Sequence, residues 1–160
     1  MNLNIGPEWY TPLFILFFAG MWALVCGILS VWSGWRQLAI RYHCREQITG
    51  TSFGLQSAAM SLRPDAFFGL YRVSYGSGLR FIANEDGIRL SILFLFRVGH
   101  PPLFIPWSEI LVSRERLFRF FPEYIRFTFS EEPPIAMWVR RRLAAKIQQV
   151  IGQDWFQEVG

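Results

Sequence analysis

The sequence has few of the residues on which catalysis and metal binding most often depend. Its 160 residues include two cysteines, Cys26 and Cys44, and two histidines, His43 and His100. The cysteines lack the C-x-x-C spacing of zinc and redox sites, and nothing completes a metal set around the histidines. Nucleotide-binding glycine patterns and the G-x-S-x-G motif are also absent. The sequence therefore predicts no enzyme, no metal and no cofactor.

Charged residues are also scarce, at 18% of the chain against about 25% in a typical soluble domain. The shortage is concentrated in the first 35 residues, which contain no lysine or arginine. The remaining chain, roughly 125 residues, is long enough for one buried core. Aromatic residues make up 18% of the sequence, which excludes a largely disordered chain.

An apolar run at residues 13–32 predicts a transmembrane helix. Ser30 is its one polar side chain, and 20 helical residues cover about 30 Å, the thickness of a bilayer's hydrocarbon core. A cleaved signal peptide would need a basic start, yet residues 1–12 carry only Glu8 as a charged side chain. A buried core helix would show a polar stripe. We therefore expect an uncleaved, single-pass anchor.

Basic residues indicate the orientation of this anchor. None precedes it, whereas Arg36, Arg41 and Arg45 follow it closely. The positive-inside rule then places the N-terminus outside and the domain in the cytoplasm. Aromatic residues at the two ends fit the interfacial belts of such spans: Trp9, Tyr10, Trp32 and Trp35.

Small residues recur along the predicted span. Ala19, Ala23 and Gly27 are spaced by four residues, and small residues let helices approach closely in a membrane. This face is a candidate for packing against another helix, either of a second copy or of another protein. After the span, residues 36–47 contain good helix formers, so we expect the helix to extend out of the bilayer.

Beyond residue 50 the pattern changes to short strands separated by turns. Residues 84–87 form an Asn-Glu-Asp-Gly hairpin signal between two of them. We expect about seven strands, drawn from residues 52–62, 68–75, 79–83, 88–96, 103–105, 110–121, 124–130 and 135–139.

The chain closes with a predicted amphipathic helix. Its apolar face consists of Leu143, Ile147, Val150 and Ile151, and Gly152 is a C-cap candidate. Basic side chains near its start oppose the helix dipole. They are candidates for contact with anionic lipid or a partner, or else ordinary surface residues: Arg140, Arg141, Arg142 and Lys146.

Residues 88–96 alternate in polarity and predict a two-sided strand. Ile88, Leu90, Ile92, Phe94 and Phe96 share the face expected to join the core. Leu93 and Leu95 lie on the opposite face, so they are either covered within the domain or contact lipid or protein outside it.

Three segments resemble bacterial pleckstrin-homology-like domains: the hairpin at residues 84–90, the I-P-W step at residues 103–110, and the helix that ends at Ile151. The run at residues 99–107 is similar to one in uncharacterised bacterial membrane proteins with a single N-terminal span. The resemblance implies an α+β fold, a bent β-barrel capped by a C-terminal helix, with non-enzymatic docking to lipids or proteins. Phosphoinositide-binding relatives use a basic first hairpin, whereas residues 52–75 contain only Arg63 and Arg72.

We therefore expect residues 1–47 to form the tail, anchor and helical extension, and residues 48–160 the β-domain. The expected function is a membrane-tethered interaction module that binds a partner membrane protein or anionic lipid, and not nucleic acid. The alternatives are an accessory subunit that docks through its transmembrane helix and an enzyme of unrecognised type. Cys44, between Arg41 and Arg45, is either inert or a reactive or lipid-modified thiol.

Overall fold

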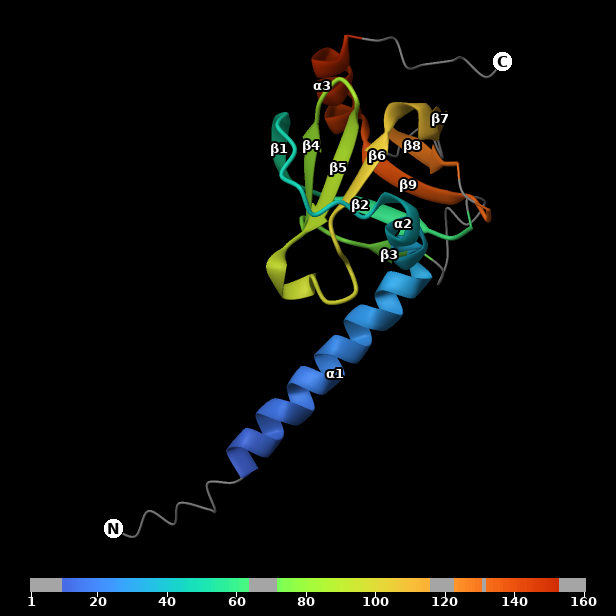
Figure 1. Cartoon of the computed structure of the whole chain (residues 1–160). Coiled ribbons are helices and arrows are strands. Elements are labelled where there is room, and N and C mark those ends of the chain that lie inside the picture. The colour runs from blue at the N-terminus through green and yellow to red at the C-terminus, as the bar shows by residue number, and fades with distance from the viewer. Residues whose placement is uncertain (1–9, 64–71, 116–122, 131, 153–160) are drawn as a thin grey trace.

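The chain divides into a projecting helix and a β-rich domain, as the computed structural model in Figure 1 shows. The structure describes residues 10–63, 72–115, 123–130 and 132–152. Helix α1 (Tyr10–Trp32) extends away from the domain. Its first half is exposed to the surroundings, and only Cys26 and Ser30 near its end are buried.

A left-handed glycine separates α1 from the next helix. Gly34 has φ of 82°, and a Cβ added to it would lie 2.9 Å from Ile135 Cδ1. Helix α2 (Trp35–Tyr42) therefore starts in a new direction and buries Trp35, Leu38 and Tyr42. The expectation of one helix continuing through residues 36–47 was wrong, because the chain turns at Gly34 to pack α2 onto the β-domain and the helix ends at Tyr42.

Two antiparallel sheets make up the domain. The first has the order β1 (Thr51–Gln56), β4 (Leu79–Ala83), β5 (Gly87–Ile92) and β6 (Leu103–Pro106). The second has the order β3 (Val73–Ser74), β2 (Ala58–Ser61), β9 (Ile135–Arg140), β8 (Tyr124–Phe129) and β7 (Ile110–Glu115). Short 3₁₀ helices η1 (Phe94–Phe96) and η2 (Trp107–Glu109) lie in the connections, and α3 (Arg141–Ile151) ends the described chain.

One core lies between the sheets, and both helices of the domain contribute to it. Phe81 and Leu90 come from the first sheet, Phe127 and Met137 from the second, and Trp35 from α2. Helix α3 adds three side chains to the same core: Leu143, Ala144 and Ile147. Figure 1 shows strands of the two sheets crossing, with α3 at the end of the domain opposite α1. The fold is α+β, and the described strands do not join into one closed barrel.

Most of the strand predictions were correct in position. The strands predicted at residues 79–83, 103–105, 124–130 and 135–139 match β4, β6, β8 and β9 within one residue at either end. The Asn84 side chain accepts hydrogen bonds from the Asp86 and Gly87 backbone amides and so closes the predicted hairpin turn. Gly152 adopts the left-handed C-cap conformation, with φ of 66°.

Other boundaries were wrong. The described residues form nine strands rather than about seven, partly because residues 52–62 divide between β1 and β2 in different sheets. Residues 64–71 and 116–122, which include parts of two predicted strands, lie outside the described residues. In α3, Val150 is exposed rather than packed on the predicted apolar face.

Candidate membrane-contact surface and pocket

Helix α1 is the one described helix long and apolar enough to cross a membrane. Ten of its side chains between Tyr10 and Val25 are large, hydrophobic and exposed. At the domain end, Trp32 is exposed as an interfacial aromatic residue would be. The same expectation for Trp35 was wrong, because Trp35 is fully buried and its Nε1 donates to the Pro101 carbonyl at 2.9 Å. Trp9 lies outside the described residues.

The connection between β5 and β6 lies along the second half of α1. Trp22 Nε1 donates to the Leu95 carbonyl at 3.0 Å, and its ring centroid is 5.2 Å from that of Phe96. Further along, Ser30 Oγ donates to the Gly99 carbonyl. We name residues 93–99 the apolar loop. Starting at the domain, this loop lies beside α1 for about two helical turns in the direction of the N-terminus.

The apolar loop exposes large hydrophobic side chains next to the predicted span. Phe94 is 75% exposed, Leu95 51%, Phe96 36% and Val98 48%. The expectation that Phe94 and Phe96 join the core was wrong, because β5 ends at Ile92 and the chain enters η1. Of the two predicted contact residues on the other face, Leu95 is exposed and Leu93 is partly buried.

The backbone of this loop is well supplied with internal hydrogen bonds. The Leu93, Phe94 and Arg97 carbonyls accept from backbone amides three residues later. The carbonyls of Leu95, Val98 and Gly99 pair with side chains of Trp22, His100 and Ser30. Irregular backbone enters a bilayer only where its polar groups are paired, and six of the seven carbonyls of the loop are paired.

A buried polar network joins the loop to the turn between α1 and α2. Tyr75 Oη donates to Ser33 Oγ at 2.7 Å and lies 3.1 Å from His100 Nε2. His100 Nδ1 is 3.1 Å from the Val98 carbonyl. Burial lowers the pKa of His100, against the opposing effect of backbone hydrogen bonds, so the neutral ring is favoured. Burial also raises the pKa of Tyr75, so its hydroxyl stays protonated.

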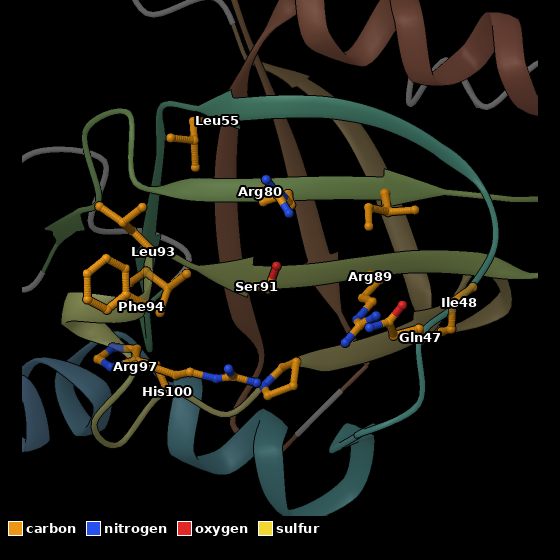
Figure 2. Close-up of a pocket in the computed structure, with 13 residues that line it drawn as sticks. Gln47, Ile48, Leu55, Arg80, Arg89, Ser91, Leu93, Phe94, Arg97 and His100 are labelled. Carbon is orange, nitrogen blue, oxygen red and sulfur yellow. The ribbon is translucent and has the colours of Figure 1, made fainter.

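A pocket of about 490 Å³ opens on the outer face of the first sheet. Arg80 of β4 lies directly across from Ser91 of β5, and Ile82 lies across from Arg89. Figure 2 shows Arg80, Ser91 and Arg89 on the same face, with Leu93 and Phe94 at one end of the pocket. Its volume is within the usual range for small-molecule sites.

The pocket is basic. Three arginines line it, and none of its lining residues is a carboxylate. We name it the arginine pocket after Arg80, Arg89 and Arg97. Within the described chain, none of the three arginines forms a salt bridge. The Nε atom of Arg89 is buried and has no hydrogen-bond partner among the same residues.

The predicted basic contact residues lie elsewhere. Arg140, Arg141, Arg142 and Lys146 are exposed at the end of β9 and on α3, at the end of the domain opposite α1. Arg141 forms a salt bridge with Glu123. The four side chains are thus close to one another but distant from the predicted span.

The three residues of the predicted helix-packing face, Ala19, Ala23 and Gly27, have different environments in the structure. Gly99 of the apolar loop lies against α1 at Gly27, where a Cβ on Gly99 would be 3.5 Å from the Gly27 Cα. Ala23 is partly buried, while Ala19 is exposed.

Cys44 is partly buried, with its thiol 3.9 Å from the Glu46 carbonyl.

Sequence reasoning missed the arginine pocket and most of the apolar loop. One signal was present: Arg89 and Arg97 interrupt an otherwise apolar run, which is unusual unless the arginines share a polar surface. The alternation at residues 88–92 correctly predicted which side chains of β5 face outward. Nothing in the sequence showed that β4 would add Arg80 to that face.

Among the described residues, no three histidine, cysteine or carboxylate side chains are grouped as metal ligands. Comparisons of the chain with protein-family models, with curated proteins and with solved structures found no match.

Proposed function

We propose that this chain is a membrane-tethered interaction module rather than an enzyme. In this proposal α1 crosses a bacterial inner membrane once, with its N-terminus outside, and the β-domain lies at the cytoplasmic face. There the domain contacts the lipid leaflet and partner proteins in the same membrane. The observation that carries the proposal is the apolar loop on α1, because it extends the hydrophobic surface of the helix onto the domain itself.

The depth of the loop supports contact with lipid. Trp22, which contacts Leu95 and Phe96, precedes the end of α1 at Trp32 by ten residues. Ten helical residues rise about 15 Å, which is about half of a hydrocarbon core. If Trp32 marks the boundary of that core, the loop tip enters the cytoplasmic half of the bilayer. The paired carbonyls described above lower the cost of placing it there.

We also propose that the β-domain is pleckstrin-homology-like, as the sequence resemblance implies. Two crossing antiparallel sheets around one core, with α3 contributing Leu143 and Ile147 at one end, support this proposal. The apolar loop lies between β5 and β6, so contact with lipid would not depend on a basic first hairpin.

Photo-crosslinking in native membranes tests the proposed function. A benzophenone amino acid replaces Leu95 in one variant and Leu111 in the other, which is 63% exposed on β7. We expect the probe at position 95 to crosslink to lipid or to an integral membrane protein, and the probe at position 111 to do neither. Crosslinking of position 95 to soluble proteins alone would contradict the proposal.

The second candidate function is an accessory subunit that docks through α1. It is favoured by the exposure of α1 from Tyr10 to Met21, which leaves Ala19 accessible. Replacing Ala19 and Ala23 with leucine would then release the protein from a larger complex on a native gel. Unchanged migration would exclude docking through this face.

A further inference from the structure

We propose that the arginine pocket binds the phosphate-bearing headgroup of an anionic phospholipid from the leaflet that the apolar loop enters. This inference rests on the proposed function, since it requires the domain to lie on the membrane. The pocket is formed by Arg80, Arg89, Arg97 and Ser91, with Leu93 and Phe94 at its edge.

Strand pairing creates the polar part of the pocket. Because Arg80 and Ser91 are paired across β4 and β5, their side chains stand side by side on the outer face. Arg89 is two residues from Ser91 on the same strand and therefore shares that face. Arg97 approaches from the loop. Three guanidinium groups and a hydroxyl, from two strands and one loop, thus line one pocket, as Figure 2 shows.

The charge of the pocket favours an anion. Each guanidinium presents several N–H donors in a plane, a geometry that matches the oxygens of phosphate. No carboxylate lines the pocket to neutralise the three charges. The N–H groups that could reach a ligand are those at the accessible ends of the guanidinium groups, since the Nε atom of Arg89 is buried from solvent. A phosphate group would supply both the charge and the acceptors.

The position of the pocket identifies the source of the phosphate as lipid. Its rim includes Pro102 and His100 on one side, which are adjacent to Pro101, the hydrogen-bond partner of Trp35 at the start of α2. On another side, Leu93 and Phe94 lead directly into the apolar loop. A headgroup in the pocket would therefore be at the level where α1 ends, with its acyl chains along the loop and α1. A free anion would make no use of this apolar edge.

Full-length protein in nanodiscs provides the test. One set of nanodiscs contains phosphatidylcholine alone, and a second contains equal parts of phosphatidylcholine and phosphatidylglycerol. Native mass spectrometry after transfer to detergent measures the lipids that remain bound. We expect the wild type to retain one phosphatidylglycerol in preference to phosphatidylcholine.

The matched variants remove equal charge from the two ends of the domain. The double variant Arg80→Gln, Arg97→Gln changes two exposed side chains of the pocket, and Arg140→Gln, Arg142→Gln changes two exposed side chains near α3. We expect the first to lose at least tenfold of the phosphatidylglycerol preference, since each basic residue adds appreciably to binding of an anionic surface. The second should keep it. Equal losses in both variants, or no preference in the wild type, would overturn the proposal.

Two further arms separate the possible failures. Inorganic phosphate and glycerol 3-phosphate are also tested without lipid, and binding of either as tightly as phosphatidylglycerol would overturn the assignment to a lipid in favour of a free anion. If the Leu95 probe crosslinks to lipid while phosphatidylglycerol shows no preference, the pocket inference fails and the proposed function stands. If the Leu95 probe finds neither lipid nor membrane protein, the proposed function itself fails. Arg89→Lys keeps the charge but loses the planar donors, so we expect it to retain less phosphatidylglycerol than the wild type.

Discussion

Burial of the apolar loop in the bilayer makes a quantitative prediction about its accessibility to water. Together the exposed fractions of Phe94, Leu95, Phe96 and Val98 correspond to about two fully exposed side chains. At about 1.5–3 kcal/mol for each fully buried side chain, lipid contact of these four side chains contributes about 3–6 kcal/mol to insertion, with the Arg97 guanidinium at the headgroup level in the proposed arrangement. Replacing Val98 with cysteine removes about a quarter of this contribution, which leaves about 2–5 kcal/mol. The loop would then be out of the bilayer less than about 5% of the time, because 1.4 kcal/mol corresponds to a factor of ten.

The assay is the reaction of single cysteines with a charged, membrane-impermeant thiol reagent in proteoliposomes. Cys26→Ala and Cys44→Ser remove the native thiols. Val98→Cys should then react at least about 30-fold more slowly than Leu111→Cys, a site of similar or greater exposure on β7. Rates within about threefold of each other would refute insertion of the loop, because that ratio corresponds to less than about 1 kcal/mol.

Two further predictions concern the joint between α1 and the domain. Because burial lowers the pKa of His100, the unfolded chain takes up this proton first as the pH falls through about 6.5. The thermal stability of the folded protein should therefore fall as the pH is lowered from 7.5 to 5.5 (about one unit to either side of that value). The His100→Asn variant should lose less stability over the same interval. An unchanged slope of stability against pH in the variant would contradict this. Gly34→Ala should be more destabilising than Gly54→Ala in denaturant unfolding, since both glycines have positive φ but only at Gly34 would the new methyl meet Ile135. We expect the φ strain to cost each variant about 1–2 kcal/mol, with a further loss at Gly34, and equal losses would show that the close packing has no effect.

Local patterns were sufficient to predict the elements whose structure is decided by neighbours in the chain. The apolar run that became α1, the turn closed by Asn84 and the α3 cap at Gly152 each depend on a few consecutive residues. The strand β4 was predicted at its observed boundaries because alternating burial of Leu79, Phe81 and Ala83 is visible as alternation in sequence.

Features decided by distant contacts could not be predicted in the same way. Continued alternation through Phe94 and Phe96 suggested a longer β5, but their environment is set by α1, more than 70 residues earlier in the chain. Trp35 has the position of an interfacial tryptophan in sequence, yet the turn at Gly34 directs it into the core. The arginine pocket depends on which strands become neighbours, and a single sequence does not show strand pairing.

The turn at Gly34 has a consequence for encounters within the membrane. The network of Ser33, Tyr75 and His100, with Trp35 packed beside it, connects the helix to the domain on two sides. If α1 spans a membrane as we propose, these contacts would limit the swing of the domain about its anchor, and the domain would diffuse in the plane of the bilayer at one height and one tilt. Binding to a neighbour in the same membrane would then cost little more than the loss of rotation about the membrane normal, and weak contacts would be sufficient to hold two proteins together.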